Sequence, residues 1–290
     1  DCANNGNCLR ASAFIGLLPF VEQQAAYDVI RAGGYGAPPY GPPANTLWYG
    51  WEIQIPGFLC PSDDRGTPSP VPNPTLGGAS SFGEVNYAFS HGDTISANGQ
   101  STSNRGMFAY SNSVRISEIK DGLSNTIAMS ERLRTSYSSG GSQSQSVKLG
   151  AATTSFITGT YPQASPGQCL TVANGPNYAT PSTTSGLFGT MWSDGTVRRC
   201  GFTTVLPPNA PSCVSADNTG STNGSGIISP TSNHPAGVNG LMADGSVRFV
   251  NESINTGNLG LSEVSSGPSP YGVWGAMGTK SGGEAAGLGG

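Results

Sequence analysis

Charge is what this sequence has least of. Only 10% of its 290 residues are Asp, Glu, Lys or Arg, whereas an ordinary globular domain contains roughly 25%. The formal net charge is −4, and lysine occurs only at Lys120, Lys148 and Lys280. Because no basic surface is available to meet a phosphate backbone, the composition excludes nucleic-acid binding. An anionic membrane surface is disfavoured as a partner for the same reason.

Long apolar runs are also absent. No stretch approaches the roughly 18 apolar residues that a membrane-spanning helix needs. The chain begins at Asp1 without the basic and apolar segments of a signal peptide, so we expect a leader to have been removed or to lie before this sequence. No charged or proline-rich linker separates two patterned halves. Residues 1–290 are therefore predicted to form a single domain.

Glycine and proline are abundant. The 43 Gly and 22 Pro make up more than a fifth of the chain, a little short of the roughly 25–30% at which disorder becomes the default expectation. The hydrophobic fraction is 36% and includes 10 Phe, 10 Tyr and 4 Trp. The chain can therefore bury a core, which long Gly, Ser, Thr and Asn loops must surround.

The cysteines favour disulfides over a metal site. No Cys-x-x-Cys occurs, and His91 and His234 lie far from any cysteine pair, so zinc has little support. An even number of cysteines in a chain poor in lysine indicates an oxidising compartment. We favour the pairs Cys2–Cys8, Cys60–Cys169 and Cys200–Cys213, with buried free thiols as the alternative.

One helix and several short strands are predicted. Apolar residues between Pro19 and Arg31 recur on one helical face, with proline suited to the first turn, and two glycines follow as a stop. The candidate strands are residues 53–60, 85–89, 106–110 and 126–133. Together these elements predict an α+β fold, in which an N-terminal helix packs on antiparallel, hairpin-rich β-structure with long loops.

Two similar segments each carry Asp-Gly between alternating apolar residues: Met191 to Arg198 and Met242 to Phe249. Asp-Gly in this setting is a strong signal for a two-residue β-hairpin turn. Arg198 and Arg248 follow at the same offset. No longer repeat surrounds them, so we predict two similar hairpins and no solenoid.

Aromatic residues cluster in Trp48-Tyr49-Gly50-Trp51, and Trp274 stands alone near the C-terminus. Packing in the core or in a loop is the leading interpretation for the cluster. The alternative is that Trp48, Tyr49 and Trp51 form a stacking platform for a sugar or a contact with another subunit.

No catalytic motif stands out. His91 and His234 are the candidate general bases, and Asp244 follows His234 by ten residues, but Gly-x-Ser-x-Gly is absent. The carboxylates that could act in pairs are Asp63 and Asp64, Glu118 and Asp121, and Glu131, and spacing selects none of them. We therefore expect no enzyme activity and no cofactor.

Three acidic clusters, Asp63-Asp64, Asp217-Asn218 and Asn251-Glu252, offer the oxygen ligands that calcium prefers. None belongs to an Asp-x-Asp-x-Asp-Gly loop, which is the strong calcium signature. The glycine-rich stretches lack the lysine of a phosphate-binding loop. A structural calcium ion stays an open alternative.

Several motifs together carry a resemblance to a family. Residues 232–250 read Ser-Asn-His-Pro-Ala-Gly-Val-Asn-Gly-Leu-Met-Ala-Asp-Gly-Ser-Val-Arg-Phe-Val. This resembles the C-terminal signature of the DUF1559 family, the prepilin-like secreted proteins abundant in planctomycetes. Further matching segments, in the same order along the chain, are residues 18–24, 58–63, 121–127 with 131–132, 204–209 with Cys213, and 274–284.

The resemblance implies a pilin-like globular domain outside the cell or on its surface. We expect a secreted, disulfide-stabilised subunit of a homopolymer, such as a filament, tube or surface layer, whose partners are copies of itself. The alternative is an extracellular module that binds a carbohydrate or another solute, with glycans as partners. Family members usually begin with a basic peptide, a processing site and a long apolar helix. None is in this sequence, so we expect that helix to have been cleaved or never used.

Two further expectations concern single segments of the chain. His234 lies in a Pro/Gly/Asn turn, so we expect a structural role in which its ring and Asn239 fix the turn before the hairpin that contains Asp244, Gly245 and Arg248. The tail is poor in apolar residues and costly to order. We expect Trp274 to supply a ligand or subunit contact and residues 284–290 to lie against a neighbouring subunit.

Overall fold

The computed structural model describes residues 6–7, 9–34, 36–44, 46–63, 71–72, 79–80, 82–135, 146–153, 165–179, 184–215 and 224–284. Its α-helices are α1 (Ala13–Leu17), α2 (Gln24–Ala32), α3 (Tyr49–Glu52), α5 (Val197–Cys200) and α6 (Gly272–Gly278). Its 3₁₀ helices are η2 (Leu18–Val21), η3 (Pro56–Phe58), η4 (Ile116–Glu118) and η6 (Pro166–Val172).

The strands are short. They are β1 (Val71–Pro72), β2 (Ala79–Ser80), β3 (Tyr87–Ser90), β4 (Ile127–Glu131), β5 (Ala151–Thr153), β6 (Ala173–Asn174), β7 (Asn177–Tyr178), β8 (Thr184–Ser185), β9 (Gly201–Phe202), β10 (Cys213–Val214), β11 (Gly226–Ile227), β12 (Gly237–Met242) and β13 (Val247–Asn251). The predicted α+β class is confirmed.

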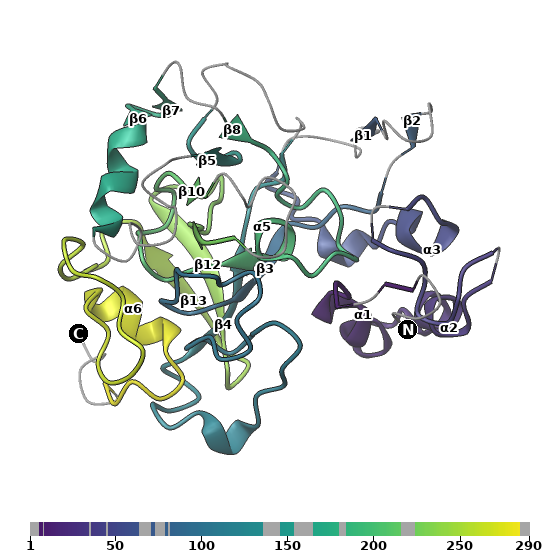
Figure 1. Ribbon diagram of the computed structural model, residues 1–290, viewed down its shortest axis with the longest axis horizontal. Coiled ribbons are helices and arrows are strands. Elements are labelled where there is room, and N and C mark those ends of the chain that lie inside the picture. The colour runs from purple at the N-terminus through teal and green to yellow at the C-terminus, as the bar shows by residue number, and fades with distance from the viewer. Residues whose placement is uncertain are drawn as a thin grey trace.

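Two sheets organise the described part of the chain. The larger has the strand order β13-β12-β4-β3-β9, and the smaller has the order β11-β10-β5-β8. Most pairs are antiparallel, but β3–β9 and β10–β5 are parallel. In Figure 1 the helices α1, α2 and α3 group at one end of the molecule, and α6 lies on the far side of the larger sheet.

The N-terminal helix is interrupted. Glu22 caps η2 with a positive φ of 60°, and α2 starts only at Gln24. The apolar run before Pro19 forms α1, which Ser12 caps by accepting a hydrogen bond from the amide of Phe14. The prediction of helix was right in place, but the left-handed turn at Glu22 splits it.

The second Asp-Gly hairpin is confirmed, and the first is wrong. Strands β12 and β13 pair over five residue pairs, and of Asp244 and Gly245 only Gly245 has a positive φ. In the first segment Val197 begins α5, and Asp194 is buried between Arg10 and Arg199. Two ion pairs hold this Asp-Gly in the core, where no hairpin forms.

Two of the four predicted strands are confirmed and two are wrong. β3 and β4 confirm the segments 85–89 and 126–133. Segment 53–60 contains η3 in place of a strand, and segment 106–110 contributes only the isolated bridge between Ala109 and Asn112.

The aromatic cluster is mostly core. Trp48 and Trp51 are buried, pack edge to face, and join Trp192 in the N-terminal core. Trp274 is fully buried and donates a hydrogen bond to the Leu206 carbonyl. Tyr49 alone of the cluster is exposed. Core packing, the leading interpretation of the cluster, is therefore confirmed for Trp48 and Trp51, and a ligand or subunit contact is wrong for them and for Trp274.

The cysteine pairing also differs. The structure contains a Cys169–Cys213 disulfide, and Cys60 and Cys200 are free thiols. The expected pairs Cys60–Cys169 and Cys200–Cys213 are therefore wrong. The bridge joins η6 to the smaller sheet, which spacing along the chain did not reveal. The pair Cys2–Cys8 lies outside the described residues.

The start of the tail folds back on its own chain. The Glu284 carboxylate accepts hydrogen bonds from the Ser269 amide at 2.5 Å and the Thr279 hydroxyl at 2.9 Å. The expectation that Glu284 lies against a neighbouring subunit is corrected by these contacts. Residues 285–290 lie outside the described part of the chain. No helix among the described residues has the length and hydropathy needed to cross a bilayer.

Gly16 offers a simple test of helix α1. A Cβ added there would meet no atom within 4 Å, and alanine favours helix over glycine. We expect Gly16→Ala to raise the free energy of unfolding by about 0.5–1 kcal/mol in urea titrations. In contrast, Gly278→Ala should destabilise the protein, because its Cβ would collide with the Thr204 side chain. A loss of stability in Gly16→Ala would contradict the placement of α1.

Candidate functional site

Three segments that carried the family resemblance converge in space. Cys60 follows η3, Glu131 ends β4, and His234 lies in the loop before β12. One ligand atom from each of these three residues lies within 4.8 Å of the other two. We call Cys60, Glu131 and His234 the three-residue cluster.

Glu131 is the centre of the cluster. Its Oε1 accepts a hydrogen bond from the Asn239 side-chain amide at 3.1 Å and lies 3.1 Å from His234 Nε2. Its Oε2 accepts from the Asn239 backbone amide at 2.7 Å. The carboxylate is therefore held in one orientation from two sides, and Asn239 and His234 meet on it.

The other two members are held as firmly. The backbone amide of Cys60 donates to Asn86 Oδ1 at 3.0 Å, and the backbone amide of His234 donates to Ser232 Oγ at 3.0 Å. Asn233 bridges the two loops by donating to the Ser62 carbonyl at 2.9 Å. These contacts hold the backbone of Cys60 and of His234 beside Glu131.

A buried ion network lies directly behind the cluster. Arg134 contacts Asp63 and Glu84, each at 2.8 Å, and all three side chains are almost fully buried. Asn86 donates to Asp63 at 2.6 Å and so connects this network to Cys60. Burial raises the pKa of Asp63, but the hydrogen bonds from Arg134 and Asn86 outweigh it, and the pKa lies below its usual value.

Tyr87 lies beside the cluster, opposite Glu131 in the β3–β4 ladder. Burial raises the pKa of Tyr87, and the nearby charges of Cys60 and Glu131 raise it further. Next to the cluster lies a cavity of about 10 Å³, lined among others by Cys60, Glu131 and Ser232. This is about the space of one water molecule.

His234 contacts Glu131 from the loop before β12, and Asn239 contacts it from within β12; their expected structural role stays a prediction. Spacing did not single out Glu131 or connect Cys60 with His234, because they are 174 residues apart in the chain. Of the candidate calcium ligands, Asp63 accepts a hydrogen bond from the Arg134 guanidinium, and Asn251 accepts one from the Ser253 backbone amide. Asp64 and Asp217-Asn218 fall outside the described residues.

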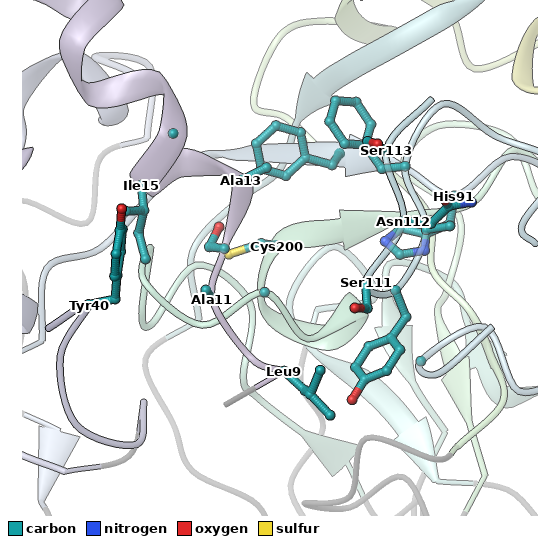
Figure 2. Close-up of a pocket in the computed structure, with 18 of the residues that line it drawn as sticks. Leu9, Ala11, Ala13, Ile15, Tyr40, His91, Ser111, Asn112, Ser113 and Cys200 are labelled. Carbon is teal, nitrogen blue, oxygen red and sulfur yellow. The ribbon is translucent and has the colours of Figure 1, made fainter. Parts of the chain in front are cut away.

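A larger pocket lies elsewhere, between helix α1 and the edge of β3. Its volume is about 600 Å³. Figure 2 shows Ile15 and Tyr40 on one side, His91 and Asn112 on the other, and Cys200 between them. The remaining aromatic residues of its lining are Tyr27, Phe89, Phe108 and Tyr110. This size lies in the range of small-molecule sites.

His91 and Asp93 follow β3 and are both buried. Burial lowers the pKa of His91 to about 4, and its Nδ1 lies 2.6 Å from the side-chain amide of Asn104. Burial raises the pKa of Asp93 to about 6 despite the attraction of Arg105, whose Nε lies 2.9 Å away. Burial therefore shifts the pKa values of these two neighbouring groups in opposite directions.

The opposite pKa shifts of His91 and Asp93 predict how stability depends on pH. As pH falls from about 6 to about 4, folded Asp93 takes up a proton that the unfolded chain does not, and acid therefore favours the folded state. His91 does the reverse, because only the unfolded chain is protonated between about 6.5 and 4. Over that range we expect wild type to gain about 3 kcal/mol of stability relative to Asp93→Asn and to lose a similar amount relative to His91→Gln. Urea unfolding of the three proteins between pH 6 and pH 4 measures these differences. If stability changed with pH equally in wild type and both variants, the raised pKa of Asp93 and the lowered pKa of His91 would be contradicted.

Comparison with known proteins gives one match. The model of a family named SBP_bac_10 and described as a protein of unknown function, DUF1559, matches residues 3–257. No match to a curated protein or to a solved structure was found. The matched range contains all three residues of the cluster and the whole larger sheet.

Proposed function

Since this chain belongs to the DUF1559 family, and its motifs resemble those of secreted, prepilin-like proteins, we propose that it is a structural subunit of an extracellular homopolymer. The observation that carries the proposal is the free edge of the larger sheet. Strand β13 forms this edge and pairs only with β12 among the described strands. An unpaired edge strand is a template for another chain.

Strand β13 has apolar side chains exposed where a partner would lie. Val247 is 66% exposed and Phe249 is 51% exposed, although both are in a well-formed strand. Natural edges are usually protected by several charged side chains, by proline, by a bulge or by a covering loop. Here Arg248 is the only charged residue of β13. The edge therefore favours addition of a strand, in which main-chain hydrogen bonds and these two side chains contribute together.

A second apolar site lies on a different part of the molecule. Phe20 in η2 is 84% exposed, the highest value of any large apolar residue that the structure describes, and Val21 beside it is also exposed. Figure 1 places the η2 region with α1 and α2, away from β13. Contact between two different surfaces produces an open chain of subunits when the rotation does not close. Phe20 and β13 lie on two different surfaces of this kind, so contacts at both would extend a chain of subunits.

The low charge of the chain supports assembly of identical copies. Only 10% of residues are charged and the net charge is −4, so repulsion between like subunits is weak. The Cys169–Cys213 disulfide is consistent with the proposed extracellular location, because disulfides persist in oxidising compartments.

The test uses the purified chain without added ligand. We expect large particles in negative-stain microscopy and a concentration-dependent mass in light scattering. Phe249→Lys should shift the mass toward the monomer, because it adds a charge to the docking edge. Leu261→Lys is the matched control, since Leu261 is exposed to a similar extent in a loop outside the two apolar sites. A monomer at every concentration, or equal effects of both variants, would overturn the proposal.

The 600 Å³ pocket favours a second candidate, a solute-binding module for a small ligand with an apolar or aromatic part. Rings of tyrosine and phenylalanine stack on sugars and aromatic groups. The pocket is lined by Tyr27, Tyr40, Phe89, Phe108 and Tyr110. This candidate no longer depends on Trp48 or Trp51, which are buried.

A p-nitrophenyl glycoside serves as the probe for the second candidate, because it joins a sugar to an aromatic ring. Gly16→Trp should fill the pocket, since Gly16 lines it and has open space at its Cβ position. Binding in equilibrium dialysis that Gly16→Trp abolishes would support the solute-binding module. Equal binding by both proteins, or none by either, would count against it.

A further inference from the structure

We propose that Cys60, Glu131 and His234 bind a divalent transition-metal ion, with Zn²⁺ as the best fit. Thiolate, imidazole and carboxylate are the three ligand types that protein zinc sites use. The thiolate disfavours calcium and magnesium, which prefer oxygen ligands alone. With Cys60 and Glu131 ionised and His234 neutral, the two negative charges balance a divalent cation.

The geometry suits a tetrahedral ion. His234 Nε2 lies 3.1 Å from Glu131 Oε1. Two such ligands of one tetrahedral zinc ion lie about 3.3 Å apart, because each bond is roughly 2.0–2.1 Å long. A thiolate and an imidazole nitrogen on the same ion lie about 3.6 Å apart, and the present separations are at most 4.8 Å. A small movement of the half-buried Cys60 side chain closes the site.

The surrounding residues hold the ligands as the outer shell of a metal site does. Asn239 donates twice to Glu131, Asn86 accepts from the Cys60 amide, and Ser232 accepts from the His234 amide. Outer-shell hydrogen bonds of this kind orient ligands and reduce the cost of organising them. Each ligand comes from a different segment, so the ion would join η3, β4 and the loop before β12.

The small cavity separates this proposal from a catalytic one. A Cys, His and Glu set also resembles a nucleophile, a base and an orienting acid. The adjacent space is about 10 Å³, which accommodates a water or an ion but no substrate carbon skeleton. Cys60 and His234 share no hydrogen bond in this structure, whereas a nucleophile and its base would be hydrogen-bonded. Cys60 and Glu131 line this space, so a water held in it would be the fourth ligand of the bound ion.

The experiment uses the whole chain, stripped with EDTA under argon and titrated with Zn²⁺ alone or Co²⁺ alone. We expect Co²⁺ to produce a thiolate-to-cobalt charge-transfer band that Zn²⁺ removes. Cys60→Ser should abolish the band and weaken Zn²⁺ binding by about 100-fold or more, and Asn239→Ala should weaken binding by about 10–100-fold. Glu118→Gln, an exposed acidic position outside the cluster, is the matched control and should change neither.

A measurement on the wild type keeps the proposal falsifiable if a variant fails to fold. Zn²⁺ should protect Cys60 from iodoacetamide, with the labelled peptide identified by mass spectrometry. Absence of the cobalt band together with unprotected Cys60 would overturn the site. Zn²⁺ affinity equal in wild type and folded Cys60→Ser would overturn it as well.

Discussion

Replacing Arg134 with methionine is expected to lower the free energy of unfolding by about 3–5 kcal/mol, because removing one partner of a buried ion network leaves uncompensated charge. Arg134 contacts both Asp63 and Glu84 at 2.8 Å, and its own side chain is almost fully buried. Methionine fills part of the volume but supplies no donor for either carboxylate. Urea unfolding at pH 7 measures the loss.

The pair of Arg31 with Asp28 provides the control. It joins exposed side chains at 3.5 Å on helix α2, and exposed pairs contribute about 0–1 kcal/mol. Arg31→Met should therefore change stability by less than about 1 kcal/mol. The Arg134 variant should also become less sensitive to acid, because the lowered pKa of Asp63 depends on Arg134. Similar losses in the two variants would contradict the buried network.

Removing the Cys169–Cys213 disulfide is expected to cost about 4 kcal/mol, because the bridge closes a long loop in the unfolded chain. The two cysteines are 44 residues apart in sequence and both are fully buried. The double variant Cys169→Ala/Cys213→Ala tests this without leaving a thiol to form other bridges. Thermal and urea unfolding under non-reducing conditions measure the difference.

Cys60→Ala, measured in metal-free buffer, is the control for the disulfide prediction, because Cys60 is a free thiol. It should cost much less than the double variant. Peptide mapping of the non-reduced protein should find Cys169 linked to Cys213. A Cys60–Cys169 or Cys200–Cys213 peptide would contradict the structure and restore the pairing that chain spacing had favoured.

The local sequence pattern predicted the structure correctly where contacts between residues close in sequence determine it. Asp244-Gly245 forms its hairpin because β12 and β13 are adjacent in sequence and pair directly. Asp194-Gly195 carries the same signal but does not form one, since Asp194 pairs with Arg10, 184 residues away. The single predicted helix fails at Glu22 for a different reason, because its left-handed backbone leaves no signature in hydrophobic periodicity.

The candidate site shows the same limit. Each of its residues lies in a motif that marked the family, but no periodicity relates Cys60, Glu131 and His234. The β4–β12 ladder brings Glu131 to Asn239 in β12, just after the loop that contains His234. The hydrogen bond that the Cys60 backbone amide donates to Asn86 Oδ1 holds Cys60 at the same place. These contacts are long-range, and a single sequence contains no record of them.

Hydrogen–deuterium exchange of strand β13 tests the central proposal, assembly through this edge, most directly. The wild-type chain is compared as particles and as a dilute monomer, with exchange resolved to the amides of Val247–Asn251. In the particles we expect the outward-facing amides of β13 to become protected, because a strand from the next subunit accepts their hydrogen bonds. Amides of β3, inside the sheet, should be protected in both states. Equal exchange of β13 in particles and monomer would contradict assembly through this edge.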